Sequence, residues 1–505
     1  MGDNMSKRLK LISASEAEME ERAFPNLYPD WEQADPAADP EDHHDEPLDA
    51  EGQVSSVFQK KVQSKIKDLL QQMEEGLKTA DPHDFSTYTG WTGIALLYLR
   101  LHQASQEALH LQRALDYVKR ATRVLNGRKV SFLCGDAGPL AVGAVVHHKL
   151  GNEAESRDCL SRLLQLQRAV LSPDSDVPDE LLYGRAGFLY ALLYVQRELG
   201  GAVDEATVAK VVTAILESGK TFSAEQKKSD RCPLLYEWHQ KQYVGAAHGL
   251  AGIYYLLMQP GANVHADVLS ELVRPSIDYV RHKRFRSGNF PSSLSNESDR
   301  LVHWCHGAPG VVHMLLLAHQ VFKEDKYLKE ATECAEVIWH RGLLRKGYGI
   351  CHGTAGNGYA FLSLYKLTKE KKYLYRSCKF ADWCLAYGTH GCRIPDRPYS
   401  LFEGTSDQSS FLCSLCCCSA EDPDSNPEVP PVRYGRNHPL PVRAGRPSEL
   451  LLSCLRTVTC WWSGLGERTP TGHACAGGAG MTGWGVTLRV TQQVDGGQRC
   501  HCGPL

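Results

Sequence analysis

The chain contains no run of 18 consecutive apolar residues, so no segment is predicted to span a membrane. A strong charge imbalance is also absent. The formal net charge of the 505 residues is −3, which creates no basic field, and we expect no nucleic-acid partner. The N-terminus is charged and lacks an apolar core, so we expect no secretory signal peptide. The sequence is therefore typical of a cytoplasmic protein.

A disulfide framework is not expected either, although the chain has 18 cysteines. Nine of them are scattered through helix-like segments of residues 1–404, as expected for reduced thiols in the cytosol. The other nine fall within the last 101 residues, where the composition changes sharply. The cysteine distribution thus argues against a secreted scaffold.

The first ten residues match a lipid-modification pattern. In residues 1–6 (Met-Gly-Asp-Asn-Met-Ser), Gly2 follows the removable methionine and Ser6 occupies the favoured position for N-myristoylation. Basic residues follow at positions 7, 8 and 10, and one acyl chain needs such a second signal for stable attachment. We expect a peripheral protein at the inner face of the plasma membrane, with the nucleus as a further compartment. The alternative is a chance Met-Gly start.

Composition divides the chain into three regions. Residues 1–55 are acidic, rich in Pro, Ala and Asp, and are expected to be disordered because they have too little apolar content to fold alone. Residues 56–404 carry a helical repeat. Residues 405–505 are rich in Cys, Pro and Gly, lack a sustained period, and are expected to form a divergent, mostly disordered tail.

The middle region repeats a Gly-x-x-Gly element that opens an apolar helix. In each unit the helix after the glycines is apolar all round and should be buried, whereas the intervening helices are amphipathic and should face solvent. This predicts an all-α, double-layered α/α toroid of helix pairs. If the inner helices run parallel, their N-termini gather at one end and favour a ligand site there. The six elements lie at Gly90–Gly93, Gly135–Gly138, Gly184–Gly187, Gly249–Gly252, Gly307–Gly310 and Gly353–Gly356.

The seventh repeat is predicted to be incomplete. A further unit begins at residues 399–404 (Tyr-Ser-Leu-Phe-Glu-Gly), but the polar residues 405–410 follow in place of a second glycine and an apolar helix. The sequence therefore predicts that the seventh inner helix is missing. A toroid without it would have an open seam with exposed apolar faces.

Two short segments combine cysteine and histidine at helix starts: residues 303–307 (His-Trp-Cys-His-Gly) and 349–353 (Gly-Ile-Cys-His-Gly). Cys305, Cys351 and His352 can supply three ligands to one zinc ion and leave the fourth tetrahedral position open, as in catalytic zinc sites. Neither segment contains a CxxC pair, which argues against a finger or ribbon. Spacing alone leaves unconnected cysteines as the alternative. The shared register of the helix starts favours a common site.

These motifs resemble those of the eukaryotic lanthionine synthetase C-like (LanC-like) proteins, particularly the paralogue with an N-myristoylation start. The resemblance implies a barrel of seven helix pairs and a zinc ion held by Cys305, Cys351 and His352. Family members continue with a seventh inner helix after the position of Gly404, and this chain departs from them there. The matching motifs lie at residues 88–93, 134–138, 245–249, 304–307, 349–353 and 391–398.

The resemblance also implies an acid/base role for His248 and a set of glutathione contacts. Lys346 and Arg393 are suited to the two carboxylates of glutathione, Arg393 by bidentate pairing. Asp136 is suited to orienting an imidazole or binding a substrate amine. The alternatives are a buried histidine at 248, a helix cap at 136 and solvated charges at 346 and 393. The implied contacts are Lys346, Arg393, Ile394, Pro395 and Asp396.

Two functions follow. The first is a zinc-dependent transferase that activates the glutathione thiol for addition to dehydroalanine or dehydrobutyrine in proteins or peptides. The second is a membrane-associated small-molecule-binding or signalling adaptor with a mainly structural zinc, which the lipidation motif at Gly2 favours.

Overall fold

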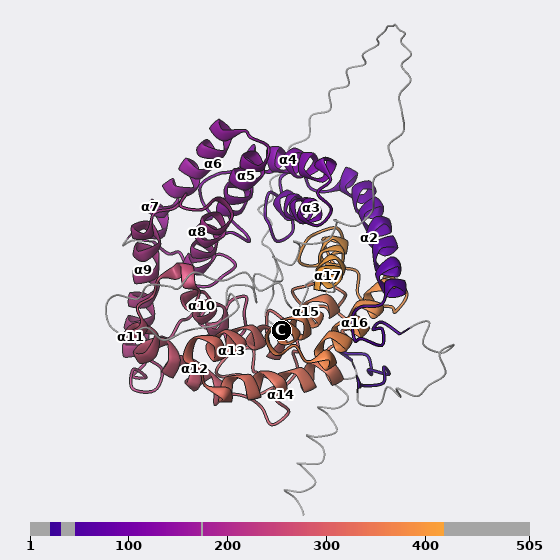
Figure 1. Ribbon diagram of the computed structural model, residues 1–505. Coiled ribbons are helices and arrows are strands. Elements are labelled where there is room, and N and C mark those ends of the chain that lie inside the picture. Colours follow the sequence, from indigo (N-terminus) through magenta and orange to yellow (C-terminus); the bar gives the residue numbers. More distant parts are fainter. Residues whose placement is uncertain (1–20, 32–45, 173–174, 419–505) are drawn as a thin grey trace, which may run out of the picture. The chain divides into compact units, whose positions relative to one another are not determined.

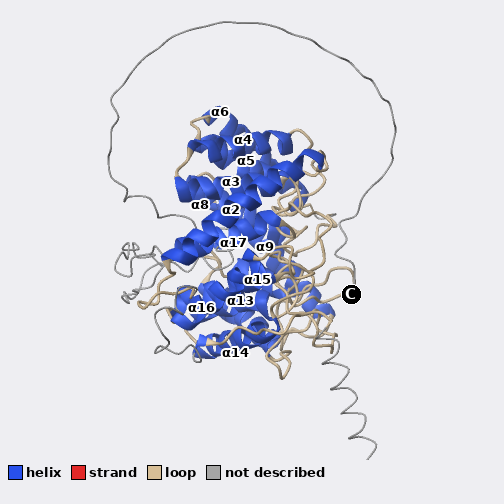
Figure 2. Ribbon diagram, turned by 90° about the vertical axis from the view of Figure 1, so that its right-hand side faces the viewer, coloured by secondary structure: helices blue, strands red, loops and turns tan. Residues whose placement is uncertain are grey.

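The computed structural model describes residues 21–31, 46–172 and 175–418, which all lie within one compact unit, Met1–Trp461. The regular secondary structure of these residues is helical, with isolated β-bridges and no strand (Figure 2). The all-α class is therefore confirmed. The lipidation motif at Gly2 and residues 419–505 of the predicted tail lie outside the described residues.

The helices form two concentric layers around a central axis (Figure 1). The inner layer comprises, in chain order, α3 (Trp91–Ser105), α5 (Ala137–Lys149), α8 (Arg185–Leu199), α10 (Leu250–Leu257), α13 (Ala308–Phe322), α15 (Thr354–Thr368) and α17 (Thr405–Cys418). The outer layer comprises α2 (Ser56–Gly76), α4 (Ala108–Thr122), α6 (Glu153–Gln165), α9 (Glu205–Glu225), α12 (Arg274–Arg281), α14 (Asp325–Arg341) and α16 (Lys371–Leu385). This arrangement is the predicted α/α toroid.

Short helical segments lie in the connections between the layers: η3 (Leu77–Thr79), α7 (Gln167–Val170), η4 (Pro260–Ala262), α11 (Ala266–Val268) and η5 (Leu269–Val273). No helix in the described ranges has the length and the apolar composition that crossing a bilayer requires.

Burial separates the two layers as the sequence predicts. The inner helix α15 is buried on several sides, and Tyr359 and Phe361 are fully inaccessible. The outer helix α14 buries a single stripe, in which Tyr327, Ala331 and Ile338 follow the helical repeat. Each large apolar side chain buried in this way contributes about 1.5–3 kcal/mol. The inner ring therefore forms the core, and the outer ring shields it from water.

The second glycine of each Gly-x-x-Gly element packs directly on the backbone. A Cβ atom at this position would lie between 1.9 and 2.4 Å from the carbonyl oxygen six residues earlier, which is closer than a Cβ atom can approach. A side chain there would displace the start of the inner helix, so the position requires glycine. The glycine and carbonyl pairs are Gly93 and Thr87, Gly138 and Phe132, Gly187 and Leu181, Gly252 and Ala246, Gly310 and Trp304, and Gly356 and Ile350.

The prediction that no inner helix follows Gly404 is wrong. Residues Thr405–Cys418 form α17, which contacts α2, α3 and α15 and closes the ring (Figure 1). Gly404 supplies the helix entry, because a Cβ atom there would lie 2.2 Å from the Pro398 carbonyl oxygen. The described part of the toroid therefore has no open seam between its first and sixth repeats.

The polar composition of α17 does not look like that of a buried helix. Its serine hydroxyls nevertheless find hydrogen-bond acceptors within the helix itself. Ser409 donates to the carbonyl of Thr405 at 3.2 Å, and Ser414 donates to that of Ser410 at 2.8 Å. A serine bonded to the preceding turn of its own helix can be buried without an unpaired polar group. Serine-rich sequence is thus compatible with an inner helix.

Replacing Phe411 by alanine is expected to lower the free energy of unfolding by about 3–5 kcal/mol. Phe411 is fully buried in α17, and its ring lies 5.1 Å from that of Tyr359. Urea unfolding followed by circular dichroism measures the change. Leu27→Ala, at a residue 89% exposed, is the matched control and should change stability by less than about 0.5 kcal/mol. Equal effects of the two substitutions would contradict the packing of α17.

The expectation of disorder across residues 1–55 is wrong for residues 21–31 and 46–55. Asp30 forms an ion pair with Arg376, whose side chain is completely buried in α16. The ring of Phe24 packs 5.2 Å from that of Trp383. These aromatic and paired charged groups dock the segment on the outer layer, although its overall composition is acidic and proline-rich.

Candidate metal centre

Two loops that precede inner helices bring the predicted metal ligands together. Cys305 lies just before α13, and Cys351 and His352 lie just before α15. One ligand atom from each of the three residues can be chosen so that all lie within 4.8 Å of one another. Cys305 and Cys351 are buried, whereas His352 is partly accessible. The arrangement therefore offers two sulfur atoms and one imidazole nitrogen on the accessible side.

Backbone hydrogen bonds fix the spacing of the two cysteine loops. The amide of Cys305 donates to the carbonyl of Cys351 at 3.1 Å, and the amide of Cys351 donates to that of Phe402 at 3.0 Å. The amide of Phe402 in turn donates to the carbonyl of Tyr88 at 3.2 Å. Backbone hydrogen bonds therefore link each of the loops before α13, α15, α17 and α3 to the next. The N-termini of these inner helices accordingly lie at the same end of the toroid.

Burial affects the protonation of Cys351 and His352. It raises the pKa of the Cys351 thiol, and the neighbouring Cys305 raises it further. Burial also lowers the pKa of His352 to about 3, with the positive charges of Lys346 and Arg393 contributing. A neutral imidazole is ready to coordinate, and the Cys351 thiol needs a nearby cation to become a thiolate. Two sulfurs and one imidazole form a donor set that suits Zn²⁺.

His248 is held by a carboxylate that the sequence analysis missed. Its Nδ1 lies 2.7 Å from Oε2 of Glu180, and both side chains are buried. The ring of Trp238 stacks on the imidazole at 4.3 Å, and Nε2 has no hydrogen-bond partner among the described residues. The imidazole of His306, next to Cys305, lies 6.1 Å from that of His248. The Glu180–His248 pair therefore lies beside the candidate metal-ligating loop with one ring nitrogen available.

The position of Glu180 within its repeat carried a signal. The residue four positions before the first glycine is serine in three of the seven units and glycine in two. Glu180 and His303 occupy this position in the two remaining units. Both residues therefore depart from the small residues of the repeat. The pairing itself joins residues 68 positions apart, so only the fold reveals it.

Glu403 is a second carboxylate that the sequence analysis did not single out. Its Oε1 lies 4.0 Å from Nε2 of His352, and burial raises the pKa of its carboxyl group. It follows Phe402, whose carbonyl accepts from Cys351, so the same loop contacts two ligands. Glu403 thus helps to define the environment of His352.

The structure does not bring Asp136 to the imidazole. Its Oδ2 accepts the backbone amides of Asn126 and Gly127, which braces the loop before α5. Burial raises the pKa of this carboxyl group, and its Oδ1 has no partner among the described residues. The carboxylate that hydrogen-bonds to an imidazole is that of Glu180.

The residues implied for glutathione lie on an accessible loop next to the ligands. The amide of Arg393 donates to the carbonyl of Arg345 at 2.9 Å, which places this loop beside Lys346. The Arg393 guanidinium is 59% exposed and pairs with Asp396 at 3.1 Å. Ile394 is 78% exposed, and Pro395 is partly buried. The cations can therefore reach a ligand in solvent, and their effect on the pKa of His352 places them near it.

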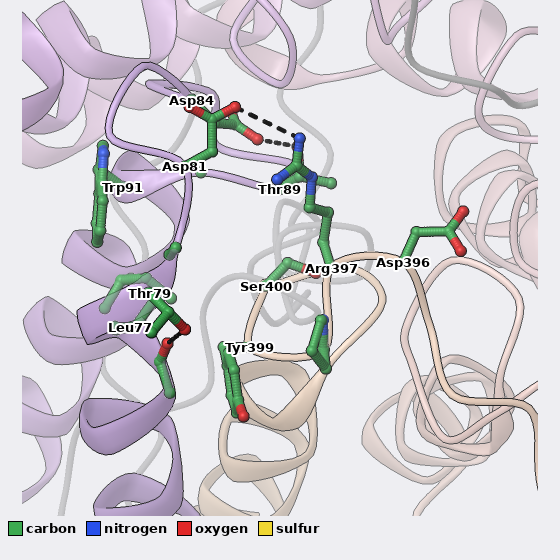
Figure 3. A pocket seen from close by; sticks show the side chains of 15 residues that line it. Leu77, Thr79, Asp81, Asp84, Thr89, Trp91, Asp396, Arg397, Tyr399 and Ser400 are labelled. Atoms are coloured by element: carbon green, nitrogen blue, oxygen red, sulfur yellow. Dashed lines mark hydrogen bonds and ion pairs between the residues drawn. The ribbon is translucent and has the colours of Figure 1, made fainter. Parts of the chain in front are cut away.

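A pocket of about 200 Å³ lies between the start of α3, η3 and residues 396–400 (Figure 3). Arg397 and Asp81 form an ion pair across it at 3.4 Å. None of the three metal-ligating residues lines this pocket, so it is not the metal centre. It adjoins the exposed loop at Asp396.

Comparisons with known proteins agree on the architecture. The family described as "Lanthionine synthetase C-like protein" matches residues 81–427. A Danio rerio protein named "Glutathione S-transferase LANCL1" is 52% identical over 397 residues, which cover 78% of this chain and 96% of that protein. The solved structure of "Nisin cyclase" superposes with a TM-score of 0.55 at 17% identity, covering 70% of this chain and 93% of that one. The last likeness concerns the fold alone.

Proposed function

This chain belongs to the lanthionine synthetase C-like family, and on that premise we propose that it is a zinc-dependent transferase that adds glutathione to dehydroamino acids in proteins or peptides. The observation that carries the proposal is the cluster of Cys305, Cys351 and His352 at the accessible end of the toroid. The name of the Danio rerio relative supports glutathione as the thiol. When bound by these three residues, zinc would supply the positive charge that keeps a thiol deprotonated at neutral pH.

Glutathione binding is assigned to the cations beside the cluster. Lys346 and Arg393 carry charges suited to the two carboxylates of the tripeptide, and Arg393 can form a bidentate pair. Arg393 would have to exchange its contact with Asp396 for the ligand, which its exposed position permits. Binding there would leave the cysteine thiol of glutathione free to reach the metal-ligating residues.

The addition step needs one proton to be moved. The glutathione sulfur forms a bond to the β-carbon of the dehydroamino acid, the carbon–carbon double bond becomes single, and the α-carbon gains a proton. His248 is suited to transferring the proton released by the thiol, because Glu180 holds Nδ1 and leaves Nε2 for the substrate. Glu180 would also stabilise the imidazolium that forms between the two transfers.

The test is a direct assay of product. The full chain, loaded with zinc, is incubated with glutathione and a peptide that contains one dehydroalanine, and the products are analysed by mass spectrometry. The proposal predicts about one zinc per chain and a peptide whose mass increases by that of one glutathione, at a rate well above that of the enzyme-free mixture. A zinc-loaded chain that gives only the enzyme-free rate would overturn the proposal.

A further inference from the structure

A permanently charged side chain is buried inside the toroid without an ion-pair partner. Arg100 lies in the inner helix α3 and is only 3% exposed. Its Nε and Nη1 atoms have no hydrogen-bond partner among the described residues, and no carboxylate of those residues lies within ion-pair distance. A guanidinium does not lose its proton in proteins. Its charge must therefore be balanced by another group.

The groups whose charges influence Arg100 come from both sides of the ring. Tyrosines on α8 and α15 are close enough to influence the pKa of its guanidinium, which burial lowers. Helices α8 and α15 are each separated from α3 by one inner helix, on opposite sides (Figure 1). One side chain can approach both only from the middle. At 1.5 Å per residue, Arg100 lies about 13 Å along α3 from Trp91, well below the metal-ligating loops.

A second guanidinium faces the same region. Arg197 of α8 pairs with Glu198 at 3.0 Å, and its guanidinium carbon lies 5.2 Å from the ring centre of Tyr194. Its Nη1 is buried without a partner, as is the hydroxyl of Tyr194. The charge of Arg197 contributes to lowering the pKa of Arg100, as expected for two neighbouring guanidinium groups. The cluster of Arg100, Arg197, Glu198 and Tyr194 thus has two positive charges, one negative charge and four unpaired donor atoms.

We propose that the axis of the toroid binds one small monovalent inorganic anion, chloride under cellular conditions, between Arg100, Arg197 and Tyr194. One negative charge makes the cluster neutral. The four donors supply hydrogen bonds from two helices that are not adjacent in the ring. The anion therefore links α3 to α8 through the centre and stabilises the inner layer.

Other occupants fit the cluster less well. Water can accept from these donors, but it leaves the charge of Arg100 uncompensated in a buried place, which is strongly unfavourable. A divalent anion would reverse the excess charge. The carboxylates of glutathione are proposed to bind Lys346 and Arg393 at the end of the toroid, and not this cluster. A monovalent anion satisfies both the charge and the donors.

The anion should stabilise the folded chain by binding it and not the unfolded one. Thermal unfolding of the zinc-loaded full chain is measured at constant ionic strength while sodium chloride replaces sodium gluconate. At 100 mM chloride we expect Tm to be higher by about 3 °C, with a saturable dependence. Arg100→Met should remove the dependence, and Arg123→Met, the same substitution at an exposed arginine, should retain it. Equal Tm values in the two salts for the unmodified chain would overturn the proposal.

Bromide gives a direct test that does not depend on any variant. Crystals of the unmodified chain grown in sodium bromide should show an anomalous peak within hydrogen-bond distance of Arg100 and Arg197. The absence of a peak there, or a chloride dependence that persists in Arg100→Met, would refute the site. Either test can fail while glutathione transfer remains intact, so this proposal and the proposed function are distinguishable.

Discussion

Replacing Cys351 by alanine is expected to reduce the zinc content from about one ion per chain to about zero and the rate of glutathione addition by roughly 1000-fold. Cys351 is fully buried and supplies one of three ligands, so its loss leaves too few donors to retain the ion. A free thiol of pKa near 8.5 is only about 3% thiolate at pH 7, which lowers the rate before any loss of positioning is counted. Atomic absorption and the mass-spectrometric assay measure the two effects.

The control for this prediction is Cys159→Ala. Cys159 is also a buried thiol, 5% exposed, but it lies in the outer helix α6. The control protein should keep its zinc and its rate. If Cys351→Ala kept most of both, the metal centre would be wrongly assigned.

Replacing His248 by glutamine is expected to lower the rate by about 100- to 10,000-fold while zinc content stays near one ion per chain. Glutamine can still bond to Glu180, but it cannot carry a proton to the substrate. Glu180→Gln should lower the rate in the same direction, because the imidazolium loses the carboxylate that stabilises it. Initial rates at saturating glutathione, with zinc measured on the same samples, separate chemistry from metal loss.

His313→Gln serves as the matched control for a buried histidine. His313 lies within α13 and bonds to Ser363 at 3.2 Å, away from the metal-ligating loops. Its substitution should leave the rate within about threefold of the unmodified chain, because transfer depends on groups that touch the substrate. A His248→Gln protein that loses its zinc, or that retains full activity, would show that His248 has another role.

The sequence predicted the toroid because its repeat is a local steric requirement. Gly356 must be glycine since a Cβ atom would collide with the carbonyl of Ile350, and the same contact recurs in five other units. This steric requirement places a glycine at the same position of each repeat, and that pattern is visible in the sequence. The candidate ligands Cys305, Cys351 and His352 could be grouped from the sequence for the same reason, because they lie at the starts of the inner helices in two repeats.

Features that depend on contacts between distant segments could not be predicted. Glu180 became a candidate only when the fold brought it to His248, and the contacts of the Asp136 carboxylate with the amides of Asn126 and Gly127 could not be read from the sequence. Helix α17 was missed because serine appears polar in a sequence, although Ser409 satisfies its hydroxyl within its own helix. In each case the hydrogen-bond partner of a polar group, and not its residue type, decides where the residue lies in the fold and what it contacts.

X-ray absorption at the zinc edge shows most directly whether the metal centre binds the sulfur of glutathione. The zinc-loaded chain is measured without glutathione and with a saturating concentration. We expect two sulfur ligands in the first sample, from Cys305 and Cys351, and three in the second. A sulfur count that stays at two in the presence of saturating glutathione would contradict it.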